Sequence, residues 1–167
     1  MHSGEWSVEW IHSWLSAVKD PEIPVLNIHD LGVLRSIEML DAETVRITIT
    51  PTYSGCPAMN TIANDVRRLL KSKGIPKVEV LESLQPPWTT DCLSPEAHAK
   101  LEAFGIAPPQ TGSPDKTALF SAAVTVPCPQ CKSRNTQLIS QFGSTACKAL
   151  YRCSDCHEPF DYFKCLR

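Results

Sequence analysis

The sequence has no long apolar run and no excess of positive charge. No stretch approaches the eighteen or more apolar residues of a membrane-spanning helix, so no membrane segment is expected. The formal net charge is −2, and aromatic residues occur without a basic stripe, which argues against nucleic acid or an anionic membrane as a partner. The first ten residues carry acids and tryptophans where a signal peptide needs a basic flank and an apolar core. We therefore expect a soluble protein of the cytoplasm.

Familiar catalytic motifs are missing as well. The chain has no G-x-S-x-G nucleophile elbow, no G-x-G-x-x-G turn and no Walker loop. Its paired carboxylates are limited to Asp20 and Glu22, which could line a polar site together with His29 and Asp30. Acids on an exposed loop are more often only solvated. The sequence thus predicts a protein that is not an enzyme by itself.

Cysteine, by contrast, is abundant, with eight residues in 167. Without an export signal we expect reduced thiols, so clustered cysteines are better explained as metal ligands or reactive groups than as disulfides. Two C-x-x-C pairs, Cys128 with Cys131 and Cys153 with Cys156, have a spacing typical of two turns that share one structural, tetrahedral zinc ion. An iron–sulfur cluster on the same four cysteines is the alternative, and the sequence does not distinguish the two.

The remaining cysteines and one histidine near these pairs are expected to play other parts. Cys147, His157 and Cys165 are spare soft ligands, but a four-coordinate zinc site is already full, so a fifth ligand is not expected.

Cys56 lies on a strand-to-helix turn, where the helix N-terminus should lower its pKa and prime it for metal or nucleophilic chemistry. The alternative is a thiol that only fills space. Cys92 also precedes a helix and could join Cys56 at one soft-metal site if the fold brings them together.

Apolar periodicity predicts an α+β fold, a small sheet with packed helices, followed by a small zinc-ribbon module. Three tryptophans of the first helix share its apolar spacing and are expected to pack in the core. The Pro-, Gly- and Ser-rich stretch that begins at Ala107 predicts a linker. The predicted division is a domain over 1–105, a linker over 106–123 and a zinc ribbon over 124–167. Helices are expected over 6–18, 57–74 and 95–104, and strands over 33–40, 44–50 and 78–81.

Three segments, in this order, resemble the iron–sulfur-assembly domain of the SufT and MIP-type proteins. They are residues 20–24 (DPEIP), 27–34 (NIHDLGVL) and 50–57 (TPTYSGCP), and the resemblance covers residues 6–105. The tail from Phe142 to Cys165 is further similar to the PaaD family, accessory proteins of the multicomponent phenylacetyl-CoA ring epoxidase of phenylacetate degradation.

The resemblance implies a role in delivering or inserting iron–sulfur clusters. Cys56 corresponds to the signature cysteine and would hold iron or a transient cluster, with Cys92 assisting and Asp20 and Glu22 shaping the site. The implied partners are the reductase and oxygenase components of the epoxidase, and the reductase cluster is the one matured. The alternative is a non-catalytic, structural component that docks the oxygenase to the reductase through its ribbon. The sequence is compatible with a homodimer and leaves the oligomeric state and cluster type open.

Overall fold

The structure, a computed structural model, describes residues 6–110 and 125–164. Contacts within the chain form two compact units, Met1–Trp88 and Thr89–Arg167. The predicted boundary at residue 105 stays a prediction, and most of the predicted linker, from residue 111 onward, lies outside the described residues. No helix among the described residues is long and apolar enough to cross a membrane.

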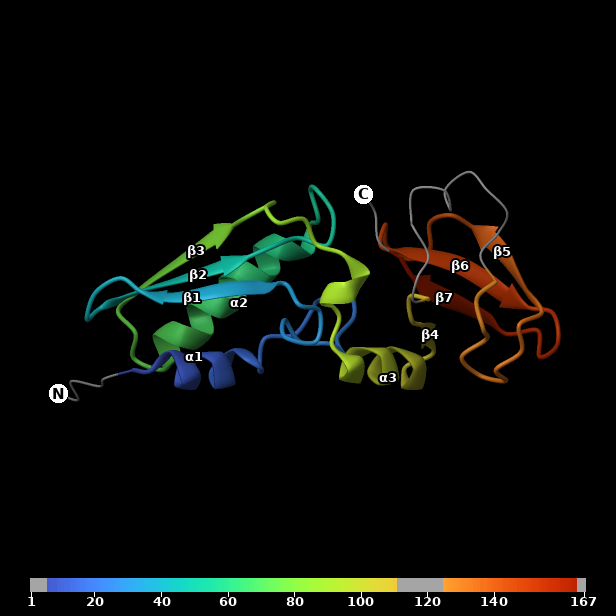
Figure 1. The fold of residues 1–167 in the computed structure, drawn as a ribbon, viewed down its shortest axis with the longest axis horizontal. Coiled ribbons are helices and arrows are strands. Elements are labelled where there is room, and N and C mark those ends of the chain that lie inside the picture. The colour runs from blue at the N-terminus through green and yellow to red at the C-terminus, as the bar shows by residue number, and fades with distance from the viewer. Residues whose placement is uncertain (1–5, 111–124, 165–167) are drawn as a thin grey trace. The chain divides into compact units, whose positions relative to one another are not determined.

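The N-terminal unit packs two helices on one face of a three-stranded sheet (Figure 1). Strand β2 lies in the centre, antiparallel to β1 and parallel to β3. This confirms the predicted α+β class. In chain order the elements are α1 (Val8–Leu15), β1 (Leu34–Met39), β2 (Thr44–Ile49), α2 (Ala58–Ser72) and β3 (Lys77–Glu82).

Alternation along β2 explains which face the helices cover. Val45, Ile47 and Ile49 are buried, and they alternate with polar residues that face away from the helices. On that polar side, the Nη2 atom of Arg46 lies 2.9 Å from Oε2 of Glu79 on the neighbouring strand. The sheet therefore has one apolar face for the core and one solvated face.

The tryptophans of α1 do not all enter the core. Ile11 and Leu15 are fully buried, whereas Trp10 is 57% exposed. Trp6 precedes the first residue of α1. Positions four residues apart advance by about 40° around a helix, so Trp10 and Trp14 follow one flank of the buried stripe instead of its centre. Trp14 is half-buried, with the Lys73 amine 5.6 Å from its ring centroid. The prediction of core packing is therefore wrong for Trp10.

The C-terminal unit begins with a short 3-10 helix and an α-helix, followed by a four-stranded sheet in the order β4-β7-β6-β5. Strands β5, β6 and β7 are antiparallel, and β4 adds to β7 in parallel. The predicted small C-terminal sheet module is confirmed. Its elements are η1 (Thr90–Cys92), α3 (Pro95–Ala103), β4 (Ile106–Ala107), β5 (Thr136–Ser140), β6 (Lys148–Cys153) and β7 (Pro159–Phe163).

Strand β4 occupies residues that the sequence assigned to the linker. Ile106 and Ala107 pair with Asp161 and Tyr162 of β7, and Ala107 is fully buried. A strand of two residues has no periodicity that a sequence pattern could reveal. The strand forms because the folded chain brings it beside β7, which is distant in the sequence, and no local pattern indicates that pairing.

Candidate metal centres

The two C-x-x-C pairs lie on turns of the same local shape. In each turn the N–H of the first cysteine donates to the carbonyl five residues later, at 2.9 Å for Cys128 and 3.0 Å for Cys153. The residue after the second cysteine has a left-handed backbone in both, with φ 64° at Lys132 and 62° at His157. The similar spacing in the sequence thus produces two matching knuckles.

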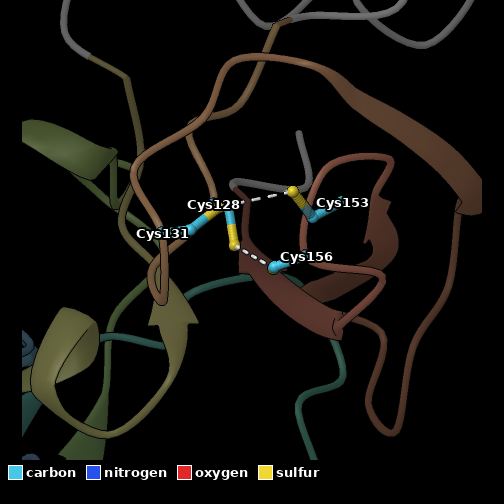
Figure 2. Close-up of side chains that lie close together, drawn as sticks. All are labelled: Cys128, Cys131, Cys153 and Cys156. Atoms are coloured by element: carbon cyan, nitrogen blue, oxygen red, sulfur yellow. Dashed lines mark hydrogen bonds between the residues drawn. The ribbon is translucent and has the colours of Figure 1, made fainter.

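The four cysteine side chains point toward a common centre (Figure 2). Their Sγ atoms all lie within 4.8 Å of one another, with 3.7 Å between Cys128 and Cys156 and 3.5 Å between Cys131 and Cys153. Four sulfurs at about 2.3 Å from one tetrahedral zinc ion would be about 3.8 Å apart, so the donors present fit zinc. In an iron–sulfur cluster the four thiolates are divided among two or more irons, and thiolates on different irons lie farther apart. The spacing therefore favours a single ion.

The surroundings of the cysteines suit a structural site. Cys128 and Cys153 are fully buried, while Cys131 and Cys156 lie at the surface of the module. The pKa of Cys153 is lowered to about 7, chiefly because the backbone N–H of Cys156 donates to its sulfur. Four thiolates fill every position of a tetrahedral ion, so the site offers no open position for a substrate.

Hydrogen bonds outside the four sulfurs tie the two knuckles together. Asp155, inside the second C-x-x-C pair, accepts from the Nδ2 atom of Asn135 at 2.8 Å and from the hydroxyl of Ser133. The N–H of Ser154 donates to the carbonyl of Asn135 at 2.8 Å. Such partners fix the orientation of metal ligands. Sequence reasoning missed Asp155, although its place between two expected ligands was a usable signal.

The left-handed position after Cys156 gives a test of the role of His157. Replacing His157 with glycine should leave zinc affinity unchanged and stability equal or higher by up to about 1 kcal/mol, since glycine adopts this backbone without strain. Replacing it with valine should destabilise the module by about 1 to 3 kcal/mol. Zinc competition titration and thermal unfolding measure both effects. A large loss of zinc affinity in His157→Gly would instead identify this histidine as a ligand.

The other cysteine of the ribbon is set apart from the metal centre. Cys147 is buried, with its Sγ atom 3.1 Å from the hydroxyl oxygen of Thr145, and it does not belong to the four-sulfur group. Cys165 lies outside the described residues.

Cys56 lies in the turn between β2 and α2, as the sequence predicted. Its backbone N–H donates to the carbonyl of Tyr53 at 3.2 Å, and its carbonyl accepts from the N–H of Met59 at 3.3 Å. Helix α2 starts two residues later, and the thiol is half-buried. The turn therefore holds the sulfur beside the first exposed N–H groups of the helix.

The pKa of Cys56 is raised, not lowered. Burial is the largest cause, and the negative charges of Glu22 and Asp20 add to it, while hydrogen bonds from the Ala58 N–H and from Tyr53 act in the opposite direction. The expectation of a lowered pKa is thus wrong, because desolvation outweighs the helix N-terminus. Both carboxylates thus act on the thiol through their charges.

Asp20 positions the loop that carries these acids. It is buried, and its Oδ1 atom accepts from the N–H groups of Glu22 at 2.8 Å and Ile23 at 2.7 Å. In the same loop, Oδ2 of Asp30 accepts from the N–H of Asn27 at 3.0 Å. Asp20 and Asp30 thus direct carboxylate oxygens to the backbone, and Glu22 is the acid whose backbone Asp20 holds in place.

The candidates around Cys56 do not make a complete metal site. In the described part of the chain, the four ribbon cysteines are the one group of three or more potential ligands placed to hold a metal ion together. Cys56, Asp20 and Glu22 therefore share a neighbourhood without a closed coordination shell. Cys92 belongs to η1 in the C-terminal unit, so its participation beside Cys56 stays a prediction.

The raised pKa predicts slow alkylation of Cys56. At near-neutral pH, brief iodoacetamide treatment should label Cys56 more slowly in the folded protein than in denaturant, because less of the thiol is ionised. Glu22→Gln should accelerate the reaction, since it removes a negative charge that opposes the thiolate. Mass mapping measures both rates, with Glu43→Gln in the β1–β2 turn as the control. An unchanged rate in Glu22→Gln would contradict the electrostatic account.

Comparison with known proteins agrees with both halves of this description. Residues 112–164 match the PaaD zinc beta ribbon domain, and residues 9–81 match the family described as iron-sulfur cluster assembly protein. A domain of unknown function (DUF59) from Bacillus anthracis has a similar crystal structure, with a TM-score of 0.52 and 29% identity, over 56% of this chain and 89% of that chain.

Two relatives carry functional names. The chain is 39% identical to an Fe-S protein maturation auxiliary factor of Porphyromonas gingivalis, over 52% of this chain and 83% of the relative. It is 47% identical to a protein of Escherichia coli (strain K12) named as a putative subunit of 1,2-phenylacetyl-CoA epoxidase, over 95% of this chain and 93% of the relative. The resemblance drawn from the motifs is confirmed, and the chain belongs to the PaaD-like family, in which an iron–sulfur-assembly domain precedes a PaaD zinc ribbon.

Proposed function

We propose that this chain is an accessory protein of a phenylacetyl-CoA epoxidase and matures the iron–sulfur cluster of its reductase component. It would act by holding iron or a cluster at Cys56 and passing it on, without catalysing the ring epoxidation. Two similarities support the proposal: one relative is named as a putative subunit of that epoxidase, and another as a maturation factor for Fe-S proteins. The zinc ribbon would supply the surface that docks on the partner.

The observation that carries the proposal is the incomplete site at Cys56. The negative charges of Glu22 and Asp20 act on a half-buried thiol and favour a cation there. The thiol remains protonated until a cation displaces the proton, which makes loading reversible. Since fewer than three ligand atoms converge on one point, an iron ion or cluster would keep open positions for the cysteines of a client.

The second candidate is a structural component that docks the oxygenase to the reductase without any cluster chemistry. The closed four-thiolate site of the ribbon favours it, because such a site contributes folding and a rigid surface but no chemistry. It gives no role, however, to the two acids whose charges act on Cys56. The two candidates differ in whether Cys56 is needed.

Anaerobic loading of the full chain tests the proposal directly. After incubation with ferrous iron and sulfide, the wild type should bind iron beyond its zinc and gain visible absorption, because a cluster is coloured and zinc is not. Cys56→Ser should lose this iron while it keeps its zinc, and Cys147→Ser, a buried cysteine outside both centres, should behave as the wild type. The loaded wild type should then pass iron to reductase that lacks its cluster.

Metal analysis, absorption spectra and gel filtration of the mixture measure loading and transfer. Equal iron and absorption in wild type and Cys56→Ser would overturn the assignment of Cys56. If the protein binds iron but does not transfer it to the reductase, its activity is iron binding alone, and the proposal that it matures the reductase is refuted.

A further inference from the structure

A separate pocket of about 410 Å³ lies in the N-terminal unit between α1, the loop before β1, and β1 itself. None of its lining residues belongs to the neighbourhood of Cys56. The pocket is lined by Val8 and His12 of α1, by His29 and Gly32 of the loop, and by Leu34, Arg35, Ser36 and Ile37 of β1.

Two imidazoles form one side of this pocket. The ring centroids of His12 and His29 are 4.2 Å apart, with 43° between the ring planes. The Nε2 atom of His29 lies 2.9 Å from the backbone carbonyl oxygen of His12. A carbonyl oxygen only accepts, so Nε2 of His29 carries a proton, and protonation of the ring takes place at Nδ1. The tautomer and orientation of His29 are thereby fixed.

A β-bulge brings Arg35 to the same pocket. The pairing of β1 with β2 shifts between Leu34 and Ser36, so that Arg35 is the extra residue of the strand. In a regular strand alternate residues face opposite sides, whereas four consecutive residues of β1 line this pocket. The Nη2 atom of Arg35 donates to the carbonyl of Pro86 at 3.2 Å, which restrains the guanidinium.

Among the described residues, the ionisable side chains that line the pocket are basic. They are Arg35, His12 and His29, and no carboxylate of the described residues belongs to the lining. Of the nearby acids, Asp30 acts on His29 through its charge. The Oε1 atom of Glu38 accepts a hydrogen bond from the hydroxyl of Ser36 at 2.9 Å. The pKa of His29 is lowered, first by burial and then by the neighbouring His12. The His29 imidazole therefore resists protonation until a negative charge arrives.

We propose that this pocket binds a small organic acid. Its carboxylate would lie against Arg35 and the His12–His29 pair, since a guanidinium presents its donors in a fork that suits a carboxylate. Its apolar body would pack on Val8, Leu34 and Ile37, which make up the other lining. A bound anion favours the charged form of His29, so binding should take up a proton and tighten as the pH falls from about 8 to about 6. The proposal is independent of the function assigned to Cys56.

Benzoate is a suitable probe, with benzamide as its uncharged counterpart and inorganic phosphate as an anion without an apolar body. NMR titration of the full-length protein should show benzoate shifting the imidazole signals of His12 and His29 and the amides of residues 34–37. Benzamide and phosphate should bind at least about tenfold more weakly, a difference of about 1.4 kcal/mol. Calorimetry in buffers of different ionisation enthalpy should detect proton uptake.

Variants separate the contributions. Arg35→Gln should weaken benzoate binding at least about tenfold, whereas Arg46→Gln, on the same sheet but outside the pocket, should leave it unchanged. His29→Gln removes the titrating ring and should abolish most of the pH dependence. The shift pattern of the wild type locates the site even if a variant unfolds. Equal binding of benzamide, equal binding of phosphate, or the absence of shifts at the pocket would each overturn the proposal.

Discussion

Replacing Cys128 or Cys153 with serine should unfold the C-terminal module while the N-terminal sheet stays folded. Both cysteines are fully buried in the small core of the ribbon, so the substitution removes a metal ligand and part of the core together. Binding of structural zinc is worth on the order of 10 kcal/mol in small metal-folded modules, more than a core of this size supplies. The residues of that core are Ala107, Val126, Cys128, Ala149, Tyr151, Cys153, Phe160 and Tyr162.

Limited proteolysis with zinc analysis measures this effect. In the Cys128→Ser protein, cleavage should spread through residues 125–164, zinc should fall to trace levels, and a fragment that contains α1 to β3 should resist digestion. Cys147→Ser is the matched control, because Cys147 is also buried in the module but lies outside the four-sulfur group. An intact tail in Cys128→Ser would refute the assignment of the four ligands.

Acid should have the same effect on the wild type. Zinc binds thiolates, so protons compete with it and the affinity falls as the pH decreases. The module should therefore lose zinc and unfold on acidification at fixed metal concentration, and excess zinc should move the transition to lower pH.

Much of this architecture could be predicted from the sequence because its causes are local. The spacing of Ile62, Val66 and Leu70 places three apolar residues on one face of α2, and these residues are buried. The alternation along β2 likewise identified its buried face. The two C-x-x-C pairs predicted the knuckles because the hydrogen bond that stabilises each turn lies within six residues. A shared metal ion then requires only that the two turns come together in the fold.

The sequence failed where the outcome depends on tertiary contacts. The pKa of Cys56 is set by how deeply the turn is buried and by acids more than thirty residues earlier, neither of which a helix N-terminus predicts. The partnership of His12 with His29 and the bulge at Arg35 also depend on how α1 packs beside β1. The sequence allowed His29 to line a polar site with Asp20 and Glu22, while favouring solvated acids, and in the structure His29 lines the separate pocket near α1.

The zinc site and the site proposed at Cys56 differ in their donors. The ribbon cysteines form a closed set of four soft donors, which suits an ion that is retained. Cys56 is a soft donor on which the charges of two carboxylates act, and in the proposed function such a mixed set would suit an ion that must leave. If the proposal holds, the ribbon would dock on the partner and Cys56 would deliver the iron.

Cells that carry Cys56→Ser should produce reductase that retains its flavin but lacks its iron–sulfur absorption, and ring epoxidation should stop. The reason is that serine removes the main soft donor of the proposed exchangeable site, while the zinc ribbon and the fold remain. Deleting the ribbon should cause the same loss through failed docking. The measurement is the ratio of iron to flavin in reductase purified from each strain, with Cys147→Ser as the control expected to match the wild type.

Comparing the variants assigns the roles. Glu22→Gln should give an intermediate iron-to-flavin ratio, since it weakens the attraction for a cation but leaves the thiol in place. Adding purified wild-type protein, iron and sulfide to reductase from the Cys56→Ser strain should restore its cluster, which separates failed maturation from failed synthesis. Reductase with a full cluster content from the Cys56→Ser strain would refute maturation at Cys56, and a loss confined to the ribbon deletion would then favour the purely structural, docking role.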